Sequence, residues 1–274
     1  HQQSDARRSA NETQRNEEAT QLDDLPISRF VDLLICQLYM TFQFKQFSVK
    51  QEHSAMKIST DGVLLGAWAP IEDTAASVLD IGAGTGLLSL MIAQRCDAPL
   101  IDAVEIDEAA YIECTDNFEN SPWGDRLFCY HASFEELVAE IDTLYDFIIS
   151  NPPFYTADTQ APETARSTAR SAAALPFETL IEGVAQLLSD RGRFAVIIPY
   201  QEEASFIGLA AAQGLYPHAL LRTKGTATTP LKRSLISFCR TEQPYTPTEL
   251  IIEESRGVYT PAYKALTEDF YLPK

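Results

Sequence analysis

Residues 77–86 read Ser-Val-Leu-Asp-Ile-Gly-Ala-Gly-Thr-Gly, and they join an apolar run to three closely spaced glycines. The run at 77–81 is typical of a buried strand, and the stretch 87–94 that follows the glycines is typical of a helix. In an open parallel sheet, ligands bind beyond the carboxyl end of such a strand. Glycines at this point let the backbone turn sharply and approach a ligand closely.

The spacing of the glycines indicates which ligand to expect. They fall at every second position, so Leu87 stands where a dinucleotide-binding G-x-G-x-x-G loop has its third glycine. Asp80, just before the loop, would repel a pyrophosphate. A carboxylate here suits a cationic ligand, such as the amino group or the sulfonium of S-adenosylmethionine. The alternative is a glycine turn that only packs a strand against a helix.

The rest of the chain repeats this alternation of strands and helices. Further strands are predicted at 100–106, 127–131, 145–150, 193–199, 215–222 and 231–239, and further helices at 108–120, 175–188 and 202–213. The pattern predicts an α/β fold with a seven-stranded, mostly parallel sheet and helices on both faces. Residues 1–39 are largely polar, so we expect a disordered or weakly helical N-terminal extension before a domain at 40–274.

Two further strand ends carry candidate binding groups. Glu105 closes the second strand, where an acid can accept both ribose hydroxyls of an adenosine ligand, and Ile106 and Asp107 could flank its adenine ring. The fourth strand ends at Asn151-Pro-Pro-Phe154, followed by Tyr155.

The prolines stiffen the backbone after Asn151. Two acceptors, the side-chain oxygen of Asn151 and the carbonyl of Pro152, could then hold one NH₂ group. Phe154 or Tyr155 offers a flat face on which a base or an amide plane stacks. A rigid turn with a buried aromatic ring is the alternative interpretation.

Taken together, the glycine loop, Glu105 and the Asn-Pro-Pro-Phe motif resemble class I S-adenosylmethionine-dependent methyltransferases, a Rossmann-like superfamily, that modify planar amino groups. The chain from Thr41 onward resembles, more closely, the bacterial family that methylates N6 of adenine 37 in tRNA1(Val). The segments that carry this second resemblance are 44–47, 55–57, 60–68, 121–123 and 263–272.

The resemblance implies a cofactor, a substrate and a set of site residues. The cofactor is S-adenosylmethionine and the partner is tRNA. The implied cofactor-binding residues are Lys57, Thr60, Asp61, Asp80, Gly82, Gly84, Gly86, Glu105, Ile106, Ser133 and Asn151. The implied catalytic residues, which hold and stack the target base, are Asn151, Pro152, Phe154 and Tyr155. Ser133 departs from the family pattern, because relatives usually carry an acid there that bonds the adenine amino group. A neutral hydroxyl accepts a weaker hydrogen bond.

Other functions fit the same motifs. A protein glutamine N5-methyltransferase or an RNA guanine N2-methyltransferase would also present a planar NH₂ to Asn151. A non-catalytic nucleotide-binding or RNA-binding module on this fold is the alternative from another class, since a fold does not fix a function.

The composition indicates the cellular compartment and argues against a metal site. Five cysteines without a Cys-x-x-Cys pair fit the reducing cytoplasm, and the four histidines are not at metal-binding spacing. No apolar run reaches the roughly 18 residues of a membrane span.

The net charge is −18, yet no acid lies between Glu163 and Glu178 or between Glu203 and Glu242. These stretches indicate a locally basic surface, although scattered solvated cations explain them equally well. We expect a cytoplasmic monomer without a metal.

Overall fold

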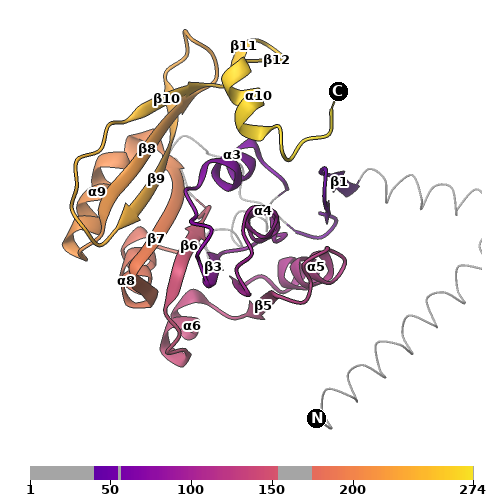
Figure 1. The fold of residues 1–274 in the computed structure, drawn as a ribbon, viewed down its shortest axis with the longest axis vertical. Coiled ribbons are helices and arrows are strands. Elements are labelled where there is room, and N and C mark those ends of the chain that lie inside the picture. Colours follow the sequence, from indigo (N-terminus) through magenta and orange to yellow (C-terminus); the bar gives the residue numbers. More distant parts are fainter. Residues whose placement is uncertain (1–39, 55–56, 154–174, 274) are drawn as a thin grey trace, which may run out of the picture. The chain divides into compact units, whose positions relative to one another are not determined.

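An eight-stranded sheet forms the centre of the structure, a computed structural model that describes residues 40–54, 57–153 and 175–273 (Figure 1). Its strand order is β10-β8-β9-β7-β6-β3-β4-β5. The strands are β3 (Ser77–Ile81), β4 (Leu100–Glu105), β5 (Leu127–His131), β6 (Tyr145–Ser150), β7 (Leu188–Pro199), β8 (Tyr216–Lys224), β9 (Leu231–Cys239) and β10 (Thr248–Ile251). Only β9 runs antiparallel to its neighbours. The predicted α/β fold with a mostly parallel sheet is confirmed.

The number of strands corrects the sequence analysis, which predicted seven. The additional strand is β10, which pairs in parallel with β8 at the edge of the sheet. Of its four residues only Leu250 is buried, and two prolines, Pro244 and Pro247, come shortly before it. An edge strand with one apolar contact shows no periodicity that a sequence pattern can detect.

Helices cover both faces of the sheet, as predicted. On one face, apolar residues of four helices join one hydrophobic cluster; these are α3 (Thr60–Trp68), α4 (Leu87–Arg95), α5 (Glu108–Glu119) and α10 (Pro261–Thr267). A second cluster is completed by α6 (Phe134–Glu140), α8 (Phe177–Leu187) and α9 (Glu203–Ala212). Three helices, α3, α6 and α10, were not predicted. The seven residues of α6 and of α10 are too short for a clear helical period, and α3 buries five consecutive residues, 62–66, so its apolar pattern shows no such period.

Short elements complete the described chain. They are β1 (Thr41–Gln43), β2 (Ser48–Lys50), the 3₁₀ turn η1 (Tyr200–Glu202), β11 (Glu253–Ser255) and β12 (Val258–Tyr259). None of the described helices combines the length and the apolarity that crossing a membrane requires. The predicted extension at 1–39 lies outside the described residues.

Two helical glycines allow a test of how tightly the layers pack. A Cβ at Gly183 in α8 would lie 2.3 Å from Cε1 of Phe134 in α6, whereas a Cβ at the exposed Gly208 in α9 would meet nothing within 4 Å. We expect Gly183→Ala to lower the free energy of unfolding by about 1–3 kcal/mol, because it overpacks the α6–α8 contact. Gly208→Ala should raise it by up to about 1 kcal/mol through helix propensity. Denaturant unfolding of both variants measures this, and equal shifts would contradict the packing.

Candidate active site

Three loops meet at one edge of the sheet because β3 pairs in parallel with β4 on one side and with β6 on the other. At the carboxyl end of β3, Ile81 lies opposite Val104 of β4 and Ser150 of β6. The glycine loop, Glu105 and Asn151 therefore share this edge. Strand order reverses at β3, and such a switch point is where ligands bind in doubly wound sheets.

The glycine loop presents open backbone at two of its three glycines. Gly82, Gly84 and Gly86 have φ angles of +71°, +57° and +80°, a region that side chains rarely adopt. A Cβ at Gly82 or Gly84 would meet nothing within 4 Å. At Gly86 it would lie 2.5 Å from Cε1 of Phe118, so this glycine serves close packing on α5. The loop thus has a ligand-accessible side, formed by the first two glycines, and a packed side.

Asp80 lies beneath the loop, fully buried. Its Oδ2 accepts hydrogen bonds from the amide (3.1 Å) and the hydroxyl (2.7 Å) of Ser89, while Oδ1 has no partner among the described residues. Burial raises the pKa of Asp80 to about 7; the bonds from Ser89 oppose this rise and the charge of Glu105 adds to it. A nearby cation would favour the ionised form. Because Asp80 has no exposed surface, its influence on a ligand is exerted from below the loop.

Glu105, at the end of the neighbouring strand β4, holds the glycine loop by a hydrogen bond. Its Oε2 accepts from the amide of Gly84 and its Oε1 from the amide of Asp107, both at 2.8 Å. Each carboxylate oxygen keeps a second lone pair for a ligand hydroxyl. Ile106 is 49% exposed beside it. The side chain of Asp107 accepts from the amide of Ala110 and caps α5, so of the two residues expected to flank an adenine, Ile106 has the accessible apolar surface.

Asn151 follows directly on β6 and lies close to the start of α3. The hydroxyl of Ser150 donates to the carbonyl of Ile81 (2.8 Å) and fixes the end of β6 beside the end of β3. A Cβ at Gly62 would lie 3.8 Å from Nδ2 of Asn151, so the first turn of α3 lies against this side chain. Pro152 is buried. Phe154 and Tyr155 lie outside the described residues.

Asp61 and Lys57, both expected to lie over the cofactor, have different partners in the structure. Asp61, in the first turn of α3, pairs with Arg233 of β9 at 2.7 Å, next to Gly62 and therefore close to Asn151. Lys57 instead donates to the backbone carbonyls of Gln51 and Glu52 and closes its own loop. Arg233 was not predicted as the partner of Asp61, because 172 positions separate them in the sequence.

Two buried residues of α5 that were also not predicted bind the backbone of residues 50–54 and of the glycine loop. The carboxylate of Glu113 accepts from the backbone amides of Glu52, His53 (3.0 Å) and Ser54 (2.9 Å). Asn117 accepts from the amide of Lys50 and donates to the carbonyls of Lys50 and Thr85. Two polar residues four positions apart on the buried face of a helix were the available signal.

Ser133 has a structural task that competes with its expected contact to adenine. Its hydroxyl accepts from the amide of Glu136 (3.2 Å), and the carboxylate of Glu136 accepts from the amide of Ser133 (2.8 Å). This capping box begins α6. The Ser-x-x-Glu signature was present in the sequence and was overlooked.

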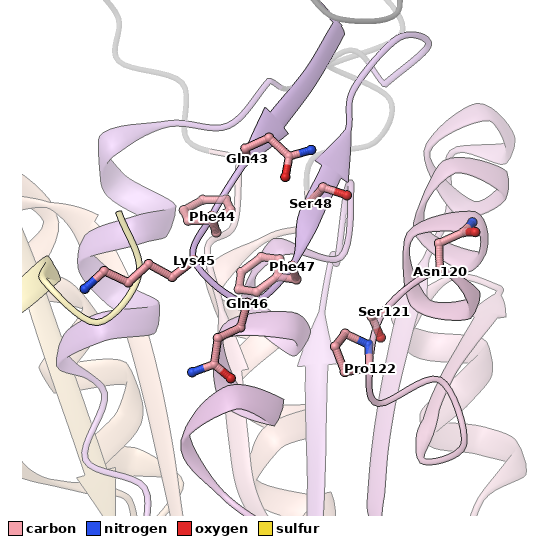
Figure 2. Close-up of a pocket in the computed structure, with 9 residues that line it drawn as sticks. All are labelled: Gln43, Phe44, Lys45, Gln46, Phe47, Ser48, Asn120, Ser121 and Pro122. Carbon is pink, nitrogen blue, oxygen red and sulfur yellow. The ribbon is translucent and has the colours of Figure 1, made fainter. Parts of the chain in front are cut away.

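A groove at the other end of α5 collects two of the segments that carried the family resemblance (Figure 2). It is lined by residues 43–48 and 120–122, with the stacked rings of Phe44 and Phe47 4.6 Å apart at its base. Asn120 ends α5, whereas Asp107 begins it at the site edge, so the groove is separate from the candidate site. No cluster of metal-binding side chains occurs within the described ranges.

Comparison with known proteins assigns the family. The family model described as "Methyltransferase small domain" matches residues 63–204. A protein of Flavobacterium psychrophilum named tRNA1(Val) (adenine(37)-N6)-methyltransferase is 55% identical over 231 residues, which cover 84% of this chain and 99% of the relative. A Bacteroides fragilis protein of the same name is 45% identical over 84% of this chain and 97% of its own length.

A solved structure supports the fold independently. A predicted O-methyltransferase from Agrobacterium tumefaciens superposes with a TM-score of 0.60 at 18% identity, covering 77% of this chain and 96% of that protein. Identity this low speaks for the fold alone, which is the Rossmann-like methyltransferase fold. From its sequence relatives, this chain belongs to the tRNA1(Val) (adenine(37)-N6)-methyltransferase family.

Proposed function

We propose that the chain transfers a methyl group from S-adenosylmethionine to the exocyclic N6 of adenine 37 in tRNA1(Val), with Asn151 holding the target amine. One observation supports these residue roles. The open backbone at Gly82 and Gly84 follows β3, and Asn151 follows the adjacent parallel strand β6. A methyl donor and an amine acceptor must lie side by side for transfer.

The residues at the end of β3 fit the cofactor. Two glycines with positive φ leave space where any side chain would project, and a buried carboxylate with a free oxygen lies beneath them. When bound, S-adenosylmethionine supplies an activated methyl on a sulfonium. Asp80 supplies compensating negative charge, the backbone at Gly82 and Gly84 gives close approach, and Glu105 accepts hydroxyl donors while it keeps the loop in place.

Asn151 and the Pro152 carbonyl would accept the two hydrogens of the adenine amine. These acceptors orient the nitrogen lone pair and stabilise the positive charge that develops during transfer. The target base must leave its stack to reach them, which costs little in a single-stranded loop. Ser59 caps α3 through the amide of Gly62 (3.2 Å), which fixes the start of this helix beside Asn151. Positioning therefore supplies most of the rate enhancement.

The remaining assignments are also proposals. Family relatives align over 231 residues, close to the length of 40–274, which supports a methyltransferase domain at 40–274 and an extension at 1–39. We propose a monomer as the active state. We propose that it acts in the cytoplasm on tRNA. The relatives are named for methylation of adenine N6, which favours adenine over the glutamine N5 and guanine N2 alternatives that fit the same motifs.

The direct experiment uses the purified chain, methyl-labelled S-adenosylmethionine and tRNA1(Val) transcribed without modification. Nucleoside mass spectrometry should find N6-methyladenosine, and a transcript with guanine at position 37 should accept no label. Label in the guanine transcript, or in a release-factor protein instead of tRNA, would refute the proposed substrate.

Replacing Asn151 tests the role of the amine site. We expect Asn151→Ala to lower kcat by about 10²–10³-fold, because one preorganised acceptor is lost from the transition state. The affinity for S-adenosylmethionine, measured by calorimetry, should change by less than about threefold, since the glycine loop is untouched. Asn120→Ala, at the end of α5, is the matched control and should keep normal turnover. Wild-type turnover in Asn151→Ala would end this mechanism.

Asp80 predicts a pH-dependent cofactor affinity. Its pKa of about 7 lies above the unfolded value, so Asp80 contributes to stability at acid pH, and that contribution is lost as the pH rises through 7. A bound cation needs the ionised carboxylate. Calorimetry between about pH 6 and 8 should therefore show cofactor affinity rising with pH. Asp80→Asn should bind more weakly at pH 8, lose this dependence, and gain stability without cofactor above pH 7. A pH-independent wild type would contradict the assignment.

A further inference from the structure

The hairpin of β8 and β9 lies in the longest stretch of the sequence without an acid. The protein has 39 acidic residues, but none lies from 204 to 241, a stretch that contains five lysines and arginines. β8 is antiparallel to β9, and β9 is antiparallel to β7, so the tip of the hairpin lies at the same edge of the sheet as the end of β7 (Figure 1). β7 in turn pairs in parallel with β6, which ends at Ser150, directly before Asn151. The acid-free hairpin therefore opens beside the proposed amine site.

Arg222 and Lys224 share one face of the sheet, and Lys232 lies close to them at the tip of the hairpin. Arg222 and Ser234 both bond Glu203 at the start of α9, through Arg222 Nε (3.0 Å), Arg222 Nη2 (2.7 Å) and the serine hydroxyl (2.5 Å). Glu249 of β10, which lies opposite Arg222 in the sheet, bonds Lys224 and so places that lysine on the same side. Lys232 lies at the register shift between β8 and β9, next to Leu231, the strand partner of Lys224. Arg233, between Lys232 and Ser234, projects to the other side, where it pairs with Asp61.

An aromatic ring completes this face. Tyr200 directly follows β7, is 36% exposed, and lies under the guanidinium of Arg222 at 5.5 Å from the ring centroid. Glu203 fixes the guanidinium with two hydrogen bonds, and the guanidinium in turn positions the ring. The result is a preoriented flat surface one strand away from Asn151.

Charge on this face is only partly compensated. Arg222 is matched by the buried Glu203, but Lys224 pairs with Glu249 (2.9 Å), whose side chain is 51% exposed. An exposed pair of this kind contributes about 0–1 kcal/mol, so a phosphate can compete for the lysine. Lys232 is exposed and pairs with no acid in the part of the chain that the structure describes. The loop between the strands adds the hydroxyls of Thr226, Thr228 and Thr229.

We propose that Tyr200, Arg222, Lys224 and Lys232, here called the hairpin face, bind the single-stranded RNA that flanks the target adenine. A base stacks on Tyr200, and Lys224 and Lys232 contact phosphates. Aromatic rings joined to arginines and lysines are the chemistry by which proteins hold unpaired RNA. The inference rests on the proposed function and adds where the RNA outside the target base is held.

The test measures binding of an unmodified anticodon stem-loop RNA by fluorescence anisotropy at several salt concentrations, with RNA KM alongside. Tyr200→Ala should weaken binding by about 5–100-fold and Tyr200→Phe should stay near wild type, because stacking needs the ring. Lys232→Ala should lower the slope of log K against log salt by about 0.7, the loss of one phosphate contact. Affinity for S-adenosylmethionine should be unchanged in all three variants.

Lys45→Ala is the matched control, since Lys45 is an exposed lysine in the groove of Figure 2, among residues of the cluster on the opposite face of the sheet. It should leave RNA binding and its salt slope intact. If Tyr200→Ala fails to fold by circular dichroism, Lys232→Ala and Lys232→Glu decide the question. RNA binding equal to wild type in the lysine variants, with methyl transfer intact, overturns the hairpin face alone. Failure of the wild type to methylate any RNA overturns the proposed function instead.

Discussion

The pairing of β3 with a parallel neighbour on each side is the constraint on which the site depends. β4 and β6 flank β3 in register. The glycine loop that follows β3 and Asn151, which follows β6, therefore begin at the ends of adjacent strands, which are about 4.8 Å apart in any sheet. Two hydrogen bonds lock the arrangement across the strand ends: Ser150 to the carbonyl of Ile81, and the amide of Gly84 to Glu105. The placement of the glycine loop beside Asn151 is thus set by backbone geometry.

Holding a carboxylate under the glycine loop has a cost that the surrounding structure offsets. Asp80 is fully buried with one oxygen unpaired, and a buried charge without a full set of partners destabilises the folded state. The packing of Gly86 against Phe118, and the bonds from Asn117 of α5 to Thr85 and Lys50, hold the loop despite this cost. The energetic cost of burying Asp80 therefore lies where a cationic ligand can reduce it.

Much of this could be predicted from the sequence, because strong local signals coincide with the central elements. The strands at 77–81, 127–131, 145–150 and 231–239 have the predicted bounds, and the glycine loop and Asn151 meet as expected. What was missed depends on tertiary pairing or on short elements. Arg233 reaches Asp61 across 172 positions, the three amides bound to Glu113 come from a segment about 60 residues earlier, and β10 exists only because β8 offers it an edge. Ser133 is different, since its capping signature Ser-x-x-Glu was visible in the sequence and was overlooked.

An acidic protein that acts on RNA needs its positive charge in the right place more than in quantity. At physiological salt, charges separated by more than about 8 Å are largely screened, so most of the −18 is weakly felt at the hairpin. The acids outside the hairpin would repel RNA backbones that approach elsewhere, which suppresses non-specific binding. A small basic face beside the catalytic edge can then guide a strand to Asn151 without holding every RNA that it meets. The burial of Glu203 fits this role, because it orients Arg222 and Tyr200 while presenting little negative charge to the solvent.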